Sequence, residues 1–261
     1  MDIYKGFAGL YDSFMANVPY NDWAFFLDAI LKDAHMVNFE KNLPYGKLIL
    51  DLACGTGSMT VRLALMGYDM IGVDKSYDML SFALQKSYEA NVKCLFLEQD
   101  MINLDLYGTV DGVICVLDGL NYILSDDELF EVFKRVRLFL NPGGIFVFDL
   151  NTEYKFKEIL GDKSFEANYD DDYYIWDNFY DSSSKINEYH MLFYSKHEKE
   201  PFSEIHYQKA HDLGQVISML LNAGFENIKL TDGYTNNPLT PKSERVLVHC
   251  NATTLKNLSL Q

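Results

Sequence analysis

The chain has 261 residues, of which 48% are hydrophobic and 23% charged, as in an ordinary globular protein. That length is enough for a substantial core in one large domain or two small ones. A formal net charge of −16 disfavours a nucleic-acid partner, because phosphate backbones are bound through lysine and arginine.

The sequence also bears on where the protein works. It contains no run of eighteen apolar residues, so no transmembrane helix and no membrane contact are expected. The first residues lack the basic and apolar parts of a signal peptide. Cysteines at positions 54, 94, 115 and 250 are scattered without Cys-x-x-Cys spacing, which favours neither a disulfide framework nor a metal site. These features predict a cytoplasmic protein without a bound metal.

The first forty residues carry a helical pattern. Tyr4 and Tyr11 belong to one set of aromatics spaced by three and four residues, and residues 23–31 form a second apolar stripe. Asn21 or Asp22 is the expected N-cap of the second helix. Residues 1–40 are therefore predicted to form an N-terminal helical cap.

From residue 47 onward, short apolar runs alternate with helical stretches. Alternation of this kind predicts right-handed crossovers and a mostly parallel sheet covered on both faces. The predicted strands are 47–52, 69–73, 92–97, 110–116, 145–150, 225–230 and 245–250. The predicted helices are 58–66, 76–88, 126–140 and 213–223, and the third of them stops at an Asn-Pro-Gly-Gly turn.

Residues 152–209 interrupt this alternation. Three aromatic-rich strands are expected here, at 173–180, 185–195 and 203–209, with a turn at 181–184 between the first two. We therefore predict an antiparallel β insertion that can serve as an acceptor lid. Residues 41–151 and 210–261 form the α/β domain around it.

A glycine-rich loop, Asp51–Gly57, follows the first strand of that domain and precedes a helix. Glycines are needed where a ligand approaches the backbone closely, because a Cβ would collide with it. A Gly-x-Gly turn on its own also suits dinucleotide-binding folds. Those folds place a third glycine at the position that Thr60 holds here, so the loop favours a different nucleotide ligand.

Acidic residues close the next two strands. Asp74 can accept hydrogen bonds from the hydroxyls of an adenosine ribose. Nicotinamide-dependent enzymes use an acid in the same way, so Asp74 alone does not distinguish the two ligands. Asp100 can accept from the adenine amino group, while Met101 packs on the ring. Together with Asp51, these acids suit a ligand with ribose hydroxyls, an exocyclic amine and a cationic sulfonium, and they would repel a pyrophosphate.

Four segments in order resemble the motifs of class I S-adenosylmethionine-dependent methyltransferases: Ile49–Gly57, Gly72–Asp74, Glu98–Met101 and Asn141–Gly144. The resemblance is strong over roughly residues 1–150 and is nearest to small bacterial enzymes, including relatives of amino-sugar and glycine N-methyltransferases. It implies a Rossmann-like sheet of seven strands with an antiparallel last strand, and a donor bound across the carboxyl ends of strands one to four. Ala53 departs from the glycine that is usual there.

The resemblance and the strand ends together predict the site. Asp118 and Asn121 can hold the amino-acid end of the donor or orient the acceptor. Alternatively, Asp118 caps a helix and Asn121 is a turn amide. Tyr11 can face the sulfonium or belong to the core. Asp118, Tyr11 and His190 are the candidates for a catalytic role. The residues expected to bind the donor are Tyr11, Asp51, Ala53, Cys54, Gly55, Gly57, Asp74, Lys75, Met79, Asp100, Met101, Leu117 and Asp118.

These features predict a methyltransferase that uses S-adenosylmethionine and modifies a nitrogen or oxygen of a small or medium-sized acceptor. A general base is needed only if the acceptor arrives protonated. The alternatives are a nicotinamide-dependent oxidoreductase and a donor-binding module without catalysis. The insertion could also mediate dimerisation.

Overall fold

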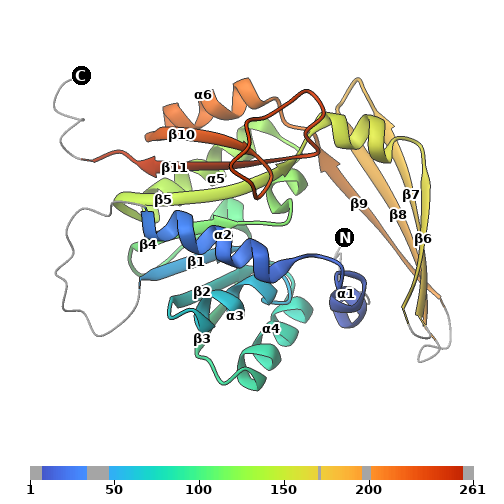
Figure 1. Cartoon of the computed structure of the whole chain (residues 1–261), viewed down its shortest axis with the longest axis horizontal. Helices are drawn as coiled ribbons and strands as arrows, with labels where there is room; N and C mark the ends of the chain where they lie inside the picture. Colours follow the sequence, from blue (N-terminus) through green and yellow to red (C-terminus); the bar gives the residue numbers. More distant parts are fainter. Residues whose placement is uncertain (1–7, 34–46, 170–171, 196–200, 255–261) are drawn as a thin grey trace.

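Two β-sheets organise the molecule, shown as a computed structural model in Figure 1. The structure describes residues 8–33, 47–169, 172–195 and 201–254. The larger sheet contains β1 (Leu48–Leu52), β2 (Asp69–Asp74), β3 (Cys94–Glu98), β4 (Val110–Cys115), β5 (Leu140–Asn151), β10 (Phe225–Asp232) and β11 (Arg245–Ala252). The smaller sheet contains β6 (Ser164–Tyr169), β7 (Asp172–Asp181), β8 (Ile186–Ser195) and β9 (Phe202–Lys209).

The larger sheet has the strand order β10-β11-β5-β4-β1-β2-β3. Strands β1 to β5 run parallel, whereas β11 runs antiparallel to both of its neighbours. The predicted Rossmann-like sheet of seven strands with an antiparallel last strand is therefore confirmed. Parallel strands bring their carboxyl ends to one edge of the sheet, and a ligand site is expected in the crevice outside that edge.

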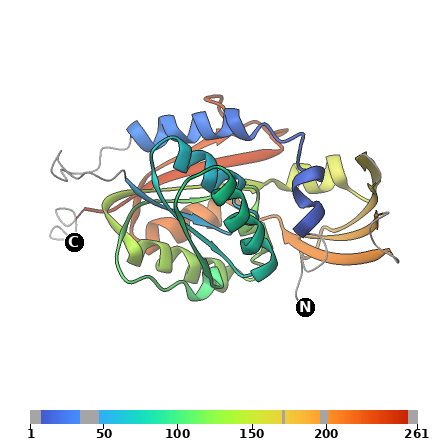
Figure 2. The ribbon, with the colours of Figure 1, turned by 90° about the horizontal axis from the view of Figure 1, so that it is seen from below.

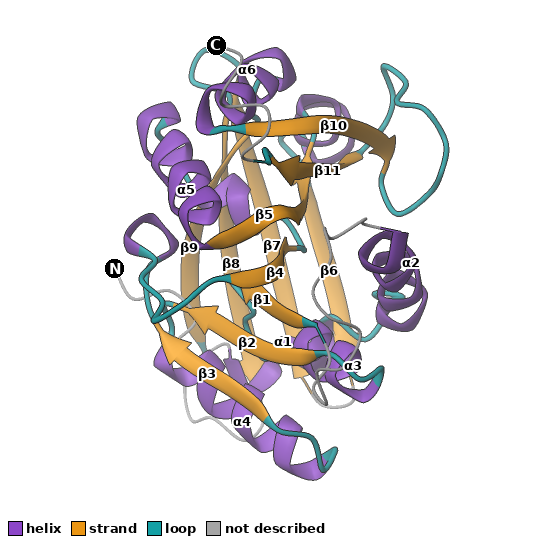
Figure 3. Cartoon of the chain, turned by 90° about the vertical axis from the view of Figure 1, so that its left-hand side faces the viewer, coloured by secondary structure: helices purple, strands orange, loops and turns teal. Residues whose placement is uncertain are grey.

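Helices cover both faces of this sheet (Figure 3). The helices are α1 (Ala8–Phe14), α2 (Tyr20–Asp33), α3 (Ser58–Leu65), α4 (Tyr77–Glu89), α5 (Asp126–Phe139) and α6 (Leu213–Ala223). Leucines and other apolar residues of α5 and α6 pack on one face, and those of α2 and α3 pack on the other. None of the described helices is long and apolar enough to cross a membrane.

Three short helical turns follow strands β3, β4 and β5 of the larger sheet, and the last of them leads into the smaller sheet. They are η1 (Met101–Asn103), η2 (Gly119–Tyr122) and the π-helical η3 (Lys155–Leu160). The smaller sheet stands beside the larger one, and α1 lies between the two (Figures 1 and 2). Phe14 of α1 contacts Tyr174 of β7 edge to face, with ring centroids 4.3 Å apart.

Three local predictions are wrong. Helix α2 begins at Tyr20, so Asn21 and Asp22 lie in its first turn rather than at its N-cap. Helix α5 ends at Phe139 and β5 begins at Leu140, because Leu140 already pairs with Val110 and the Pro-Gly-Gly segment is accommodated as an irregularity in that ladder. The insertion has four strands instead of three, since β6 pairs with β7.

Candidate active site

The glycine-rich loop reverses direction through three residues with positive φ: Ala53 (59°), Gly55 (53°) and Gly57 (71°). A Cβ at Gly57 would lie 2.8 Å from the Cβ of Ala83 in α4, so that glycine allows α3 and α4 to approach. A Cβ at Gly55 would meet nothing within 4 Å. Ala53 adopts the same left-handed conformation at a cost of about 1–2 kcal/mol, because its Cβ crowds the backbone there.

Asp51 lies at the end of β1 and is only 1% exposed. The Thr60 hydroxyl donates a hydrogen bond to its Oδ2 at 2.5 Å. Burial raises the pKa of Asp51 to about 7, and the bond from Thr60 opposes this shift only in part. Thr60 therefore holds the acid beneath the loop, a role that its position in the sequence did not reveal.

Asp74 at the end of β2 ties the second strand to the loop. Its Oδ2 accepts a hydrogen bond from the Gly55 N–H at 2.8 Å, and its Oδ1 accepts one from the Ser76 N–H at 2.9 Å. Burial raises its pKa, against the lowering effect of these two bonds. Each oxygen keeps a lone pair for a further donor. Helix α4 is capped instead by Ser76, whose hydroxyl accepts from the Met79 N–H.

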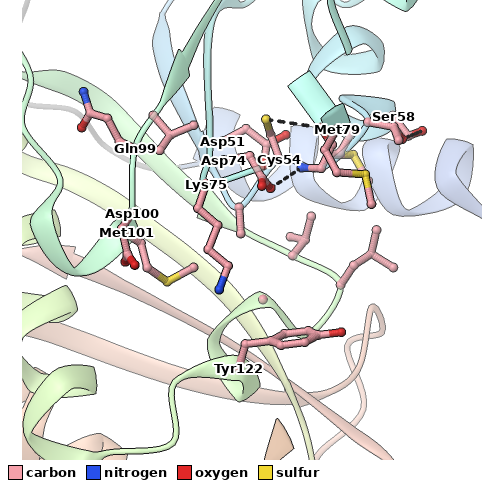
Figure 4. Close-up of a pocket in the computed structure, with 18 of the residues that line it drawn as sticks. Asp51, Cys54, Ser58, Asp74, Lys75, Met79, Gln99, Asp100, Met101 and Tyr122 are labelled. Carbon is pink, nitrogen blue, oxygen red and sulfur yellow. Dashed lines mark hydrogen bonds between the residues drawn. The ribbon is translucent and has the colours of Figure 1, made fainter. Parts of the chain in front are cut away.

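Asp100 follows β3 and caps the short turn η1. Its Oδ1 accepts a hydrogen bond from the Ile102 N–H at 2.9 Å. This is the helix-cap contact expected of a loop acid. The carboxylate nevertheless faces the same pocket as Met101 (Figure 4).

These strand ends surround one pocket (Figure 4). The predicted donor residues that line it are Tyr11, Asp51, Ala53, Cys54, Gly55, Asp74, Lys75, Met79, Asp100, Met101 and Leu117. Gly57 and Asp118 do not line it. Lining residues that the sequence did not indicate include Thr56, Ser58, Met59, Gln99, Tyr122 and Glu128. Burial raises the pKa of the Cys54 thiol, so this sulfur remains protonated and is a poor nucleophile.

The turn after β4 is held in an unusual conformation by a buried ion cluster. Leu117 and Asp118 have φ values of 63° and 56°, two left-handed residues in succession. Their N–H groups donate to the Asp149 carboxylate at 3.0 and 2.6 Å. Arg245 bridges Asp149 and Asp118, with an N–O distance of 2.8 Å to each.

The carboxylate of Asp118 is fully engaged inside the protein. In addition to its ion pair with Arg245, it accepts a hydrogen bond from the side-chain amide of Gln208 in β9 at 2.7 Å. Burial opposes its ionisation, but the positive charges of Arg245 and Lys155 outweigh burial and lower the pKa of Asp118. Asn121 is similarly occupied, since it donates to the carbonyls of Asn151 and Lys209 and accepts from the Asn151 N–H. Both side chains bind the turn to the two sheets.

His190 lies away from the pocket. Buried Asn187, Tyr189 and Phe193 alternate along β8 on the inner face, so His190 stands on the other face of the small sheet. There its Nε2 contacts Glu188 and its ring meets the edge of Phe179 at 5.0 Å.

Helix α1, near the beginning of the sequence, also contributes to the pocket. Tyr11 lines the pocket, and burial raises its pKa well above the usual value. Asp12 accepts hydrogen bonds from Thr56 at 2.7 Å and Ser58 at 3.2 Å, and it pairs with Lys86 of α4 at 2.8 Å. The helix is thereby attached to the glycine-rich loop. Tyr4 lies outside the described residues.

Comparison with known proteins identifies the family. A family model described as a methyltransferase domain matches residues 49–144. A putative methyltransferase of Bacillus subtilis, YqeM, is 35% identical over 247 residues, which cover 94% of this chain and 95% of that protein. The chain belongs to the S-adenosylmethionine-dependent methyltransferase family.

Solved structures of this methyltransferase family agree with that assignment. A crystal structure of an S-adenosylmethionine-dependent methyltransferase from Clostridium acetobutylicum is 30% identical, has a TM-score of 0.83, and matches over 96% of this chain and 99% of that one. The sugar N-methyltransferase KedS8 from Streptoalloteichus shares the fold at 18% identity, with a TM-score of 0.72 over 93% of this chain and 92% of its own. The nicotinamide-dependent alternative finds no support among these proteins.

Proposed function

We propose that this methyltransferase binds S-adenosylmethionine in the pocket at the carboxyl ends of β1 to β4 and methylates a nitrogen or oxygen of a small or medium-sized acceptor. The observation that carries the proposal is the charge of the pocket. Asp51, Asp74, Asp100 and Glu128 face it, whereas Lys75 is the one lysine or arginine among its described lining residues. Such a pocket attracts a cation and repels a pyrophosphate.

The residues fit the donor at each end. Asp74 has free lone pairs for two ribose hydroxyls, and Asp100 with Met101 would hold the adenine. Gly55 leaves open space where the ligand has to approach the backbone. S-adenosylmethionine, when bound, supplies a methyl group activated by a positively charged sulfur. The protein then has to align the acceptor with that group, which accounts for most of the acceleration.

We assign the acceptor side of the proposed site to helix α1 and the smaller sheet. Helix α1, which contributes Tyr11 to the pocket, would lie over the donor, and the smaller sheet would form the wall against which the acceptor binds. We assign the reaction to the cytoplasm, where the described thiols of Cys54, Cys94, Cys115 and Cys250, none of them in a disulfide, stay reduced. Association of two chains through the insertion stays a prediction.

Calorimetric titration with S-adenosylhomocysteine and with NADH tests the binding part of the proposal. We expect saturable binding of the first at a one-to-one ratio and no binding of the second. Tight binding of NADH without binding of S-adenosylhomocysteine would overturn the assignment of the pocket.

Transfer of a labelled methyl group from the donor into the small-molecule fraction of a bacterial extract tests catalysis. A labelled product with a new carbon–nitrogen or carbon–oxygen bond is the expected result. Donor binding without label in any fraction, small or macromolecular, would favour a binding module without catalysis.

A further inference from the structure

The inner face of β9 is polar where a packed strand face is usually apolar. Glu204, His206 and Gln208 alternate with exposed Ile205 and Tyr207, so the three polar side chains share the face that meets η2. His206 and Gln208 are each 2% exposed, and the Glu204 side chain is 8% exposed. Burying polar groups is costly unless each has a partner.

His206 links Glu204 to Tyr122 of η2, and Tyr122 lines the pocket. Its Nε2 lies 2.9 Å from a carboxylate oxygen of Glu204, and its Nδ1 lies 3.2 Å from the hydroxyl of Tyr122. The rings of Tyr122 and His206 meet edge to face, with centroids 5.9 Å apart. Three side chains that are hydrogen-bonded in series therefore run from the smaller sheet to η2.

The chemistry of these groups fixes the direction of the hydrogen bonds. An ionised carboxylate only accepts, so Nε2 of His206 carries the hydrogen that points at Glu204. The Nδ1 of a neutral imidazole is then an acceptor, and the hydroxyl of Tyr122 donates to it. A phenolic oxygen can accept a proton as well as donate one.

Tyr122 also lines the donor pocket, on the side away from Asp51 and Asp74 (Figure 4). Leu117 and Gly119 line the pocket next to it in the chain. Tyr122 thus joins the pocket to a buried histidine–carboxylate pair. This arrangement, a pocket group that is hydrogen-bonded to a histidine oriented by an acid, is the one that proteins use to move protons.

We propose that Tyr122, His206 and Glu204 form a proton relay that removes the hydrogen from the acceptor's nucleophilic nitrogen or oxygen. This inference rests on the proposed function. The acceptor forms a bond to the methyl carbon, and the carbon–sulfur bond breaks with its electron pair left on sulfur. Tyr122 takes the acceptor's proton as it passes its own to Nδ1 of His206, and Glu204 stabilises the resulting imidazolium. Tyr122 is the catalytic residue, and the other two act through it.

The groups around the relay define its pH dependence. Among the described residues, Glu204 faces His206 from β9, Tyr122 faces it from η2, and Tyr189 is its register partner on β8. Tyr11 of α1 lies within electrostatic reach of Tyr122. The carboxylate of Glu204 is thus a charged group in direct contact with His206.

The pH profile of methyl transfer tests the relay, with labelled donor and the small-molecule extract as probes. Tyr122→Phe keeps the ring and removes the hydroxyl, while Glu204→Gln keeps an acceptor for Nε2 and removes the charge. Tyr207→Phe, on the exposed face of the same strand, is the control. Affinity for S-adenosylhomocysteine should stay within about twofold of the wild type in Glu204→Gln and Tyr207→Phe, because neither side chain lines the donor pocket.

At pH 7 we expect Tyr122→Phe to lose about 100-fold in transfer rate, the lower end of general-base effects. Glu204→Gln should lose less, roughly tenfold, because Glu204 acts only through His206. For an ammonium or phenol acceptor, which loses its proton unaided near pH 10, both losses should shrink toward that pH. Tyr207→Phe should follow the wild type throughout. A purely structural role would lower the rate equally at every pH. Profiles that stay parallel to the wild type would overturn the relay while leaving the proposed function intact.

Nitrogen NMR of His206 in the complex with S-adenosylhomocysteine gives a second readout that needs no acceptor. We expect the tautomer with hydrogen on Nε2. A hydrogen on Nδ1 would overturn the relay, because Tyr122 could not donate to it. If the wild type binds S-adenosylhomocysteine but transfers no labelled methyl group to any fraction, the proposed function fails, and the relay fails with it.

Discussion

The two sides of the pocket are formed from the chain in different ways. On the donor side, each acid lies at or just after the end of its own strand, and Asp51 is hydrogen-bonded to Thr60, only nine residues later. On the acceptor side, the contacts join distant segments. Tyr122 and His206 are 84 residues apart, and Asp118 and Arg245 are 127 apart. The donor side is thus specified by short local motifs, whereas the acceptor side exists only once both sheets have assembled.

Removing Arg245 should give the largest effect and shows how far the acceptor side depends on one distant residue. In Arg245→Met, the buried carboxylates of Asp118 and Asp149 lose their shared cation. Breaking a buried ion pair in this way costs about 3–5 kcal/mol of unfolding free energy, measured by urea denaturation. Lys32→Met, which removes an exposed pair with Asp28, should cost less than about 1 kcal/mol.

Adding Asp118→Asn to Arg245→Met should recover part of that stability, because only one buried charge then remains. A double variant as unstable as the single one would show that repulsion between these carboxylates is not the cause.

A pH effect is expected on the donor side, from Asp51. Its pKa is about 7 in the folded protein and about 3.8 in the unfolded chain. Between these values the folded state binds one proton more than the unfolded chain. A rising pH therefore lowers the free energy of unfolding, and this loss is complete above pH 7. At about 1.4 kcal/mol per pKa unit, the total is up to about 4 kcal/mol.

Urea denaturation of the ligand-free protein and of Asp51→Asn, between pH 5.5 and 8, isolates this contribution. The asparagine still accepts the hydrogen bond from Thr60. The wild type should lose stability relative to the variant as the pH rises toward 7, and the difference should then level off. A constant difference across this range would show that Asp51 is not protonated in the fold.

The smallest effect should come from Asp74→Ala, which leaves the acceptor side untouched. Loss of a charged hydrogen-bond acceptor should weaken binding of S-adenosylhomocysteine by about 1–3 kcal/mol in calorimetric titration. Asp69→Ala, at the other end of the same strand, is the matched control and should bind normally. Equal affinity of both variants would remove Asp74 from the proposed donor site.

The same contrast explains what could be predicted from the sequence. Apolar runs that end in an acid identified β1 and β2, and with them the location of the pocket. Strand β6 was missed because its sequence, Ser-Phe-Glu-Ala-Asn-Tyr, carries little strand signal and becomes a strand through pairing with β7.

Single residues on the acceptor side left no recognisable pattern either. Arg245 stands at the start of an ordinary apolar strand, and His206 has two exposed neighbours in the chain. Their roles arise from which strands lie side by side. Asp118 was predicted to bind the donor or act in catalysis, but the sequence could not show that Arg245 and Gln208 bind its carboxylate.

The position of Arg245 on the last strand also has a consequence for biosynthesis. In a chain emerging from the ribosome, the glycine-rich loop and both acids of the cluster appear at least 96 residues before Arg245. Until β11 inserts between β5 and β10, Asp118 and Asp149 lack the guanidinium of Arg245 that bridges them. A nascent chain can therefore acquire its nucleotide pocket early, but it gains a competent acceptor side only after β11 has been synthesised.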